Sequence, residues 1–468
     1  MSLLPPRDAA SGPERNARAG RSSVPTRRGA LRALALHGIA AAAFEPAVQS
    51  AQTRAADRSL PSDLPDPFTA VTSKKGLQVQ MVDDAIALGV RHAGLNLDLC
   101  DLIVPEPSPD AILHRHDGGE FWFRRDAVEE HDRRIRGLSD RGMLVYLILL
   151  AYRHPDATVN RLLIHPRYDA TAPNRLGALN TVTTEGRRWL AATCDFLASR
   201  WSNPASPHGR AVGYIVGNEV NSHWFWSNLG RSSLAEFAAD YEPAVRIVHD
   251  AVRRYAVWPR VYLSLEHHWN IRYEAADDDQ AFPARPFLAE FARLARERGD
   301  FDWHVAFHPY PENLFEPRFW NDRTATDADD TPRITLRNLP VLTRFLDREE
   351  MRYRGRPRRV ILSEQGFHSP DGPDGEAVQA AAYCLAHRLI RDQPGIDAFI
   401  LHRHVDHAEE GGLRLGLWTH RPDSISTPDR QKRMYACFRA ADTSAEDAAF
   451  AFALPLIGLE SWPAAPSD

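Results

Sequence analysis

Two short apolar segments of the sequence each lead into a glutamate. Residues 212–216 are followed by Asn218-Glu219, and residues 360–362 are followed by Glu364. If both segments are parallel strands whose carboxyl ends meet at one face of the fold, the two carboxylates lie close together, although 145 residues separate them in sequence. Such a pair can break a bond to oxygen, because one carboxyl group protonates the leaving oxygen while the other attacks the carbon or activates water.

The elements that would position this pair follow from the hydrophobic pattern. From about residue 66 to 440, short apolar runs alternate with longer segments of helical spacing, which is typical of βα units around a parallel sheet. We expect strands at 68–72, 92–97, 144–150, 212–216, 261–265, 304–307, 360–362 and 398–401. We expect helices at 77–88, 127–138, 184–200, 234–255, 287–298, 336–348, 377–391 and 430–439. Eight strands, each followed by a helix, predict an α/β fold of the (β/α)8 TIM-barrel type.

The segments that follow several strands are long and rich in Pro, Asp, His, Trp and Tyr. On a barrel these loops lie at the catalytic face, where they shape a substrate cleft. We find no internal repeat and no Gly/Ser-rich linker, so we expect one catalytic domain at 66–440 and a short Ala/Pro-rich tail at 441–468. A doubly wound nucleotide-binding sheet is disfavoured, because no G-x-G-x-x-G motif opens a first helix.

Residues 1–50 form a basic leader. The segment from Thr26 to Arg32 contains the pair Arg27-Arg28 and precedes a modest apolar run at 33–44, with small residues near 48–50. This order resembles a bacterial twin-arginine export signal, although a basic leader without a signal function is the alternative. The run is too short to span a bilayer. We therefore expect an exported, periplasmic or extracellular protein with no membrane span.

Composition excludes other partners. The net charge is −5, and residues 1–50 hold seven arginines against three acidic residues, so the remaining chain is more acidic still. An acidic body argues against nucleic acid or an anionic membrane surface as the partner. The four cysteines show no C-x-x-C spacing, which predicts small buried side chains rather than a disulfide framework or a zinc site. They are Cys100, Cys194, Cys384 and Cys437.

Asn218-Glu219 at the end of the fourth expected strand, with Glu364 at the end of the seventh, resembles clan A, a large group of retaining (β/α)8-barrel glycoside hydrolases. The order of elements matches over residues 66–420. The resemblance implies that Glu219 is the acid/base, that Asn218 bonds the sugar 2-hydroxyl group and that Glu364 is the nucleophile. It also implies an enzyme that cleaves O-glycosidic bonds of an oligo- or polysaccharide by double displacement and needs no cofactor.

Both glutamates also have purely structural interpretations. Glu219 could be an acidic residue in the first turn of a helix, where the helix dipole favours a negative charge. Glu364 could be paired with one of the many arginines. The two glutamates occur together at the two strand ends that clan A requires, which favours the catalytic interpretation.

Further candidate ligands of a carbohydrate substrate follow the other strands. His308 and Tyr310 follow the sixth strand, and in clan A a Tyr or His from this region bonds the nucleophile. His268 follows the fifth strand, and Asn96 lies near the end of the second. Such groups at the mouth of a barrel can bond sugar hydroxyl groups.

Two tryptophans are candidates for stacking on the apolar face of a sugar ring. Trp224 follows Glu219, and Trp418 follows the eighth expected strand, although tryptophan more often packs in a core.

One feature of clan A has no evident counterpart. Many members carry an arginine near the end of the second strand, whereas Arg91 lies at its beginning, so Arg153 or Arg403 could take that place.

Two other classes of protein remain open. A mononuclear metal site could be built on His402, His404 and Asp406, whereas the Lys-bridged binuclear hydrolase is excluded because no lysine occurs between 76 and 431. A barrel that binds carbohydrate without cutting it is the non-enzymatic alternative, and the paired glutamates argue against it. A serine hydrolase is disfavoured, because no G-x-S-x-G motif is present.

Overall fold

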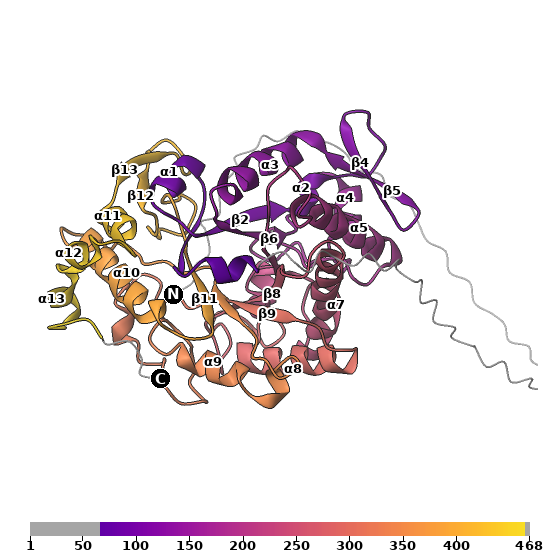
Figure 1. Ribbon diagram of the computed structural model, residues 1–468. Helices are drawn as coiled ribbons and strands as arrows, with labels where there is room; N and C mark the ends of the chain where they lie inside the picture. Colours follow the sequence, from indigo (N-terminus) through magenta and orange to yellow (C-terminus); the bar gives the residue numbers. More distant parts are fainter. Residues whose placement is uncertain (1–65, 464–468) are drawn as a thin grey trace, which may run out of the picture. The chain divides into compact units, whose positions relative to one another are not determined.

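The computed structural model describes residues 66–463 and contains a closed barrel of eight parallel strands (Figure 1). Around the barrel the strands follow the order β1-β11-β10-β9-β8-β7-β6-β2. This arrangement confirms the predicted (β/α)8 fold. The strands are β1 (Lys75–Gln78), β2 (His92–Asp98), β6 (Leu144–Leu150), β7 (Gly213–Val216), β8 (Arg260–Glu266), β9 (Trp303–His308), β10 (Val360–Leu362) and β11 (Ile396–Leu401).

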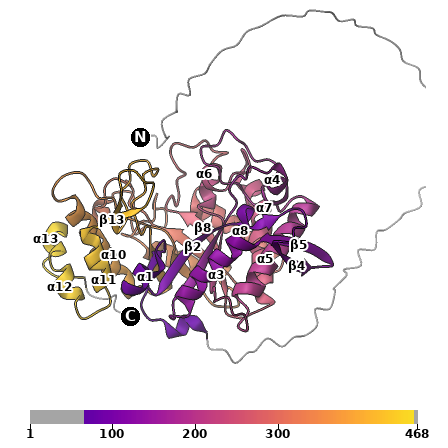
Figure 2. The same ribbon diagram turned by 90° about the horizontal axis from the view of Figure 1, so that it is seen from above.

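Helices surround the strands in both ribbon views (Figures 1 and 2). Each buries one apolar face; in α8, for example, Phe287, Leu288, Phe291 and Ala295 are buried at helical spacing. The longer helices follow the predicted ranges closely. The helices of the barrel are α1 (Val82–Ala87), α3 (Arg125–Ser139), α5 (Thr184–Trp201), α7 (Leu234–Arg253), α8 (Ala284–Glu297), α9 (Pro340–Leu346), α10 (Gly375–Arg391) and α11 (Arg433–Ala440).

The long connections carry their own small elements. After β2, the strands β3 (Ile103–Val104), β4 (Ala111–His116) and β5 (Gly119–Arg124) form an antiparallel sheet, and after β11 the strands β12 (Trp418–His420) and β13 (Pro428–Gln431) pair. The short helices are η1 (Pro67–Ala70), α2 (Leu99–Leu102), α4 (Ala157–Leu163), η2 (Val220–Ser222), α6 (His223–Trp226), η3 (Phe319–Asn321) and η4 (Glu349–Met351).

The prediction of the first strand is wrong. Residues 67–70 form the 3-10 helix η1, and the first strand is β1, which we expected to lie partly in a helix at 77–88. An apolar residue occurs at position 68 outside any strand, because Phe68 packs against the inside of the barrel. Its ring centroid lies 6.4 Å from that of Tyr146. β1 lacks an apolar run because the barrel leaves no room there: a Cβ atom on Gly76 would lie 2.8 Å from the Ile400 side chain.

The inside of the barrel is filled by its own side chains. Tyr146 and Tyr262 are fully buried, and their ring centroids lie 6.1 Å apart. They pack in one cluster with Ile148, Ile215, Ile361 and Ile400. The barrel is therefore a packed core rather than a pore, and ligands have access only at its end.

The segment after α11 is not a tail. Residues 446–457 form α12 (Glu446–Phe450) and α13 (Ala453–Ile457), which lie beside α10 and α11 in both ribbon views (Figures 1 and 2). Phe450 is fully buried against Tyr383 and His387 of α10. The alanine-rich composition of this segment reflects close helix packing, and the prediction of a tail at 441–468 is wrong for the described residues.

Other expectations concern the whole chain. All four cysteines are buried and unpaired, as predicted. Within residues 66–463, no helix is long and apolar enough to cross a membrane. The leader at 1–50, with its twin-arginine-like signal, lies outside the described residues, so its prediction is not tested.

We predict that Phe450→Ala lowers the free energy of unfolding by about 3–5 kcal/mol, because it leaves a cavity between α10 and α12. Urea denaturation followed by circular dichroism would measure the change. Leu456→Ala is the control, since Leu456 is 39% exposed in the neighbouring helix and its loss should cost little. Equal, small effects of both substitutions would show that this segment does not contribute to the cooperative core.

Candidate active site

The carboxyl ends of the strands gather polar side chains at one end of the barrel. Gln78 ends β1, Glu266 ends β8 and His308 ends β9, while Glu219 and Glu364 closely follow β7 and β10. One polar atom each of Glu219, His308 and Glu364 lies within 4.8 Å of the other two. The structure thus brings together the two glutamates that the sequence singled out.

Glu219 lies in a tight turn at the end of β7. Its backbone is left-handed, with φ of 41°, and its N–H donates to Ser264 Oγ at 3.0 Å. This conformation is unusual for a residue other than glycine and is found mainly where the surroundings impose it. The Glu219 side chain makes no capping bond to η2. The interpretation of Glu219 as a helix-capping carboxylate is therefore not supported.

The Glu219 carboxyl group is buried beside a histidine. His308 Nδ1 lies 2.9 Å from Glu219 Oε1, and the Glu219 side chain is 13% exposed. Burial raises the pKa of Glu219, and the negative charges of Glu364 and Glu266 raise it further, outweighing the opposing effect of His308. The site therefore favours the protonated form of Glu219.

Glu364 has the opposite environment. Tyr310 Oη donates to Glu364 Oε1 at 3.1 Å, and Gln78 Nε2 donates to Oε2 at 3.2 Å. Burial would raise the pKa of this carboxyl group, but the charges of His402 and His308 and the two hydrogen bonds outweigh it and lower the pKa to about 2. Glu364 is therefore ionised while Glu219 favours its proton, the division of roles that an acid and a nucleophile need.

A third carboxylate, Glu266, supports the turn that holds Glu219. Its Oε1 accepts from Asn221 Nδ2 at 2.6 Å and from Ser222 Oγ at 3.0 Å, and its Oε2 lies 2.6 Å from His268 Nδ1. Asn221 and Ser222 belong to η2, which directly follows Glu219. Although burial opposes it, His268 lowers the pKa of Glu266 to about 2. Glu266 is therefore an ionised anchor.

The other expected ligands divide into three groups. Tyr310 bonds Glu364, whereas His308 forms its hydrogen bond with Glu219. His268 contacts Glu266 rather than either of the paired glutamates. Asn218 is partly buried and its amide bonds no other described residue, and Asn96 is exposed on β2 in register with Ile148 of the inner cluster. The last two amides are available to a ligand.

Both candidate tryptophans are engaged by residues other than the paired glutamates. Trp224 is only 7% exposed and packs under the guanidinium group of Arg231. Trp418 donates from Nε1 to Asp84 at 2.9 Å, and its ring lies edge-on to Tyr435. The prediction of Trp224 as a stacking platform is wrong because its ring is covered, and Trp418 is fixed by partners outside the pair.

The alternative metal site does not form. His402 contacts Gln78 and Glu410, His404 Nε2 lies 2.8 Å from Asp84, and Asp406 pairs with Lys432 at 3.0 Å. The three side chains thus turn to different partners instead of converging on one point. Among the described residues, they belong to no group whose ligand atoms lie close together. The hypothesis of a mononuclear site built on these residues is wrong.

The expected arginine is also absent from the site. Within residues 66–463, Glu364 forms no ion pair with an arginine. The alternative interpretation of Glu364 as the structural partner of an arginine is therefore not supported. Arg153 lies over the ring of Tyr168, and Arg403 contacts His402 and Glu410. Neither takes the place beside the nucleophile that clan A gives to its arginine.

Three side chains at the barrel mouth were not predicted. Gln78 was missed because the first strand was expected at 68–72, whereas it lies at Lys75–Gln78. Tyr152 lies two residues after the end of β6 and is 42% exposed, with its N–H bonded to Asp98. Tyr273 is partly buried and packs against His268 and Phe225. Tyr152 is more exposed than either tryptophan, and its position after the strand at 144–150 was the available signal.

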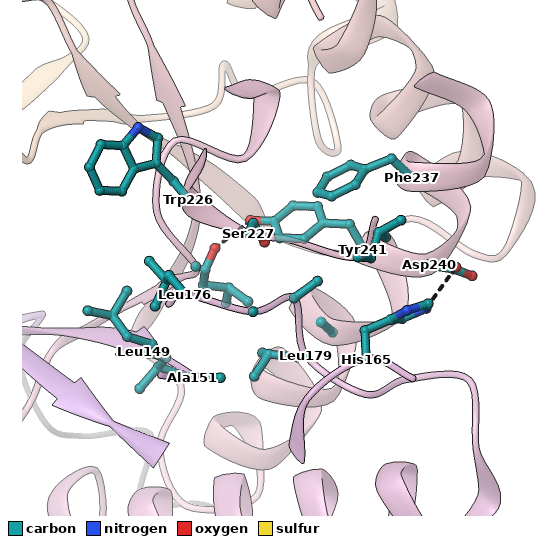
Figure 3. A pocket seen from close by; sticks show the side chains of 17 residues that line it. Leu149, Ala151, His165, Leu176, Leu179, Trp226, Ser227, Phe237, Asp240 and Tyr241 are labelled. Atoms are coloured by element: carbon teal, nitrogen blue, oxygen red, sulfur yellow. Dashed lines mark hydrogen bonds and ion pairs between the residues drawn. The ribbon is translucent and has the colours of Figure 1, made fainter. Parts of the chain in front are cut away.

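Figure 3 shows a separate small cavity between β6, β7 and α7. Its volume is about 10 Å³, room for about one water molecule. The lining is mostly apolar, with Leu149, Leu176 and Phe237. Two of its polar side chains are bonded to protein groups: Tyr241 Oη donates to the Val216 carbonyl oxygen at 2.6 Å, and His165 Nε2 lies 3.2 Å from Asp240. It is a packing defect behind the active-site turn rather than a substrate site.

The fold and site define a (β/α)8 barrel with two opposed glutamates at its mouth. The chain belongs to the family described as "Family of unknown function (DUF5722)", whose model matches residues 67–465. No curated protein matches the sequence significantly.

Solved structures similar to this chain are glycoside hydrolases. A hyperthermophilic beta-glucosidase from Pyrococcus furiosus has a TM-score of 0.52 and 14% identity over 80% of this chain and 86% of that one. A family 39 glycoside hydrolase from Bacteroides cellulosilyticus WH2 has a TM-score of 0.48 and 14% identity over 82% of this chain. The chain spans 63% of that protein's length. At these identities the likeness shows the fold alone.

We predict that Glu266→Gln destabilises the protein by about 3 kcal/mol at neutral pH. The pKa of Glu266 lies at about 2 in the folded protein, below its ordinary 4.5, so its ionisation stabilises the fold above that ordinary value. This stabilisation is lost as the pH falls, so the difference between variant and wild type should narrow from about pH 5 toward pH 3.

Urea denaturation at several pH values would measure this difference, with exposed Glu129→Gln as the control. A difference that stays constant with pH would contradict an ionised Glu266.

Proposed function

We propose that the protein is a retaining glycoside hydrolase that cleaves O-glycosidic bonds of an oligo- or polysaccharide. The observation that carries the proposal is the pair Glu219 and Glu364, which have oxygens within 4.8 Å of one another and opposite preferences for a proton. Retaining enzymes hold their carboxyl groups about 5–5.5 Å apart, whereas inverting enzymes leave about 6.5–9.5 Å for a water molecule. The short separation supports retention.

In the first step, Glu364 attacks the anomeric carbon while Glu219 transfers its proton to the glycosidic oxygen. The bond from that carbon to oxygen breaks, an alcohol leaves, and a glycosyl ester of Glu364 remains. Glu219 is now ionised, and His308 at 2.9 Å stabilises its charge. In the second step, Glu219 takes a proton from water, the hydroxide attacks the same carbon, and the ester bond breaks. Both glutamates return to their starting forms.

The residues around the pair support a sugar as substrate. Asn218 and Asn96 offer amide groups that bond no other described side chain, and Tyr152 offers an exposed ring. A barrel that only binds carbohydrate would use the same groups. It would not require one buried glutamate that favours its proton beside another that is ionised, so this arrangement favours the enzyme.

We predict that Glu364→Ala lowers kcat on an aryl glycoside by about 10⁴-fold or more, because no covalent intermediate can form. Glu219→Ala should cost about 10²–10⁴-fold. Since a similar structure is a beta-glucosidase, 4-nitrophenyl β-glucoside is the first substrate to test within a panel of aryl glycosides. Added azide should restore turnover, giving the inverted glycosyl azide with Glu364→Ala and the retained one with Glu219→Ala.

Exposed Glu349→Ala is the control and should keep wild-type turnover. Wild-type turnover by Glu364→Ala would refute the assignment. If the wild type cleaves no glycoside and Glu219→Gln binds oligosaccharides as tightly as the wild type does, the binding barrel is the better explanation.

We also propose that the protein is exported in a folded state to the periplasm or beyond. The support is the order of residues 26–50, with Arg27-Arg28 ahead of a short apolar run. In a bacterium with twin-arginine export, replacing both arginines by lysine should leave the full-length chain in the cytoplasmic fraction, while Arg15→Lys should not change its distribution. Unchanged export of the Arg27→Lys/Arg28→Lys chain would refute this route.

A further inference from the structure

A second cluster of histidine and carboxylate side chains forms where the β4–β5 hairpin packs against α5 (Figures 1 and 2). His114 and His116 are alternate residues of β4, so their side chains lie on the same face of the strand. His114 Nε2 lies 2.9 Å from Asp195 Oδ2 of α5, and His116 Nδ1 lies 3.4 Å from the same oxygen. The three side chains are 15%, 5% and 6% exposed. The hairpin thus presents two imidazole rings to one buried carboxylate.

The hairpin turn fixes where the two rings lie. Asp117 and Gly118 join β4 to β5 in a two-residue turn, and both have left-handed backbones, with φ of 45° and 74°. This turn sets the register of the hairpin, and with it the face on which both histidines lie. The His114 ring packs edge-on against Phe196 of α5, with 5.6 Å between centroids, and is nearly parallel to the His116 ring. Packing therefore holds both rings in place before any ligand binds.

The contacts of the His116 ring determine which of its nitrogens carries the hydrogen. Arg254 Nη1 lies 3.3 Å from His116 Nδ1, and an arginine can only donate. Nδ1 therefore accepts with its lone pair, and the hydrogen of the ring is on Nε2. Within the described chain that nitrogen forms no hydrogen bond, and it lies 3.4 Å from Asp117 Oδ2. A carboxylate beside the second ring nitrogen is the usual arrangement around a metal-bound histidine.

Three electron-pair donors surround one small volume. His116 Nδ1 and Asp195 Oδ2 both present lone pairs across 3.4 Å, an arrangement that a cation between them stabilises. His114 Nε2 donates to the same carboxylate, and it becomes a third ligand when its hydrogen moves to Nδ1 of the ring. The separations of 2.9 and 3.4 Å are near the distance of about 3.3 Å between neighbouring ligands of a tetrahedral Zn²⁺ ion.

The cluster has two further polar partners. Tyr255 Oη donates to Asp195 Oδ2 at 3.0 Å, and Arg254 Nη1 lies 3.0 Å from Asp195 Oδ1. Within residues 66–463, Arg254 is the only arginine or lysine that forms an ion pair with Asp195. Its side chain is 50% exposed and follows the last turn of α7, so it can turn into solvent. A metal ion can therefore take the place of the guanidinium group.

We propose that His114, His116 and Asp195 bind a divalent transition-metal ion, Zn²⁺, in place of the Arg254 guanidinium group. Two imidazole nitrogens and one carboxylate oxygen suit Zn²⁺, whereas Ca²⁺ and Mg²⁺ prefer oxygen ligands alone. A water molecule completes the tetrahedral shell. Because the ligands come from β4 and α5, the bound ion fastens the hairpin to a helix of the barrel. This site does not depend on the proposed glycosidase activity.

The first experiment locates the ion. Crystals of the protein grown with one equivalent of Zn²⁺ should show an anomalous difference peak at the zinc absorption edge. The peak should lie about 2.0–2.2 Å from His114 Nε2, His116 Nδ1 and Asp195 Oδ2, with Arg254 turned away. Absence of a peak, or a peak at other residues only, would overturn the proposal. This measurement needs no variant and no substrate.

The second experiment measures affinity, by isothermal titration calorimetry of the metal-free protein with Zn²⁺. His116→Gln should weaken binding more than about 100-fold, since losing a ligand costs more than the 10–100-fold loss that follows removal of an outer partner. Arg254→Ala should tighten binding, because a competing positive charge is removed. His420→Gln removes a histidine outside the cluster and should bind as the wild type does. Equal affinities of wild type and His116→Gln would mean adventitious zinc only and would overturn the proposal.

The third experiment tests the fastening of the hairpin by hydrogen exchange. Zn²⁺ should slow the exchange of backbone amides in residues 111–124 of the wild type and should not change it in His116→Gln. Equal slowing in both proteins, or no slowing in the wild type at saturating Zn²⁺, would overturn this role of the ion.

Discussion

Two buried carboxyl groups whose oxygens lie within 4.8 Å repel each other when both are ionised, unless neighbouring groups compensate the charge. The surrounding residues meet this constraint by giving the two groups different environments. The barrel places Glu219 where burial and negative neighbours favour its proton, and places Glu364 where donors and positive charge favour its loss. The two environments differ because different strands supply them. Because the ends of several parallel strands meet at one face of a closed barrel, two carboxyl groups a few ångströms apart can have different neighbours.

The basic side chains that form hydrogen bonds with the carboxyl groups of the site are histidines rather than arginines. His308 serves Glu219, His402 faces the side of Glu364, and His268 pairs with Glu266. Each of these histidines lies beside a carboxyl group, so acidic and basic side chains are paired at the mouth of the barrel. Imidazole rings are short and rigid, which keeps every group close to a defined position.

The sequence predicted those features that depend on apolar periodicity. Seven of the eight strands and both glutamates were found because apolar runs end at them. β1 was missed because its inward positions are Gly76 and Gln78, which give no apolar signal, and the barrel leaves no room for a side chain at Gly76. The roles of Trp224 and Glu266 could not be inferred, since they depend on which side chains the long loops bring against them.

The closure of the barrel has a kinetic consequence. Residues 75–77 of β1 pair with 399–401 of β11, so the last ladder joins parts of the chain more than 300 residues apart. Contacts of such sequence separation form late and slowly, because the entropy of closing the intervening chain is lost before they form. During synthesis, Glu364 therefore lacks Gln78 and His402 as settled neighbours until β11 has left the ribosome. The active site is completed only by the final closure of the sheet.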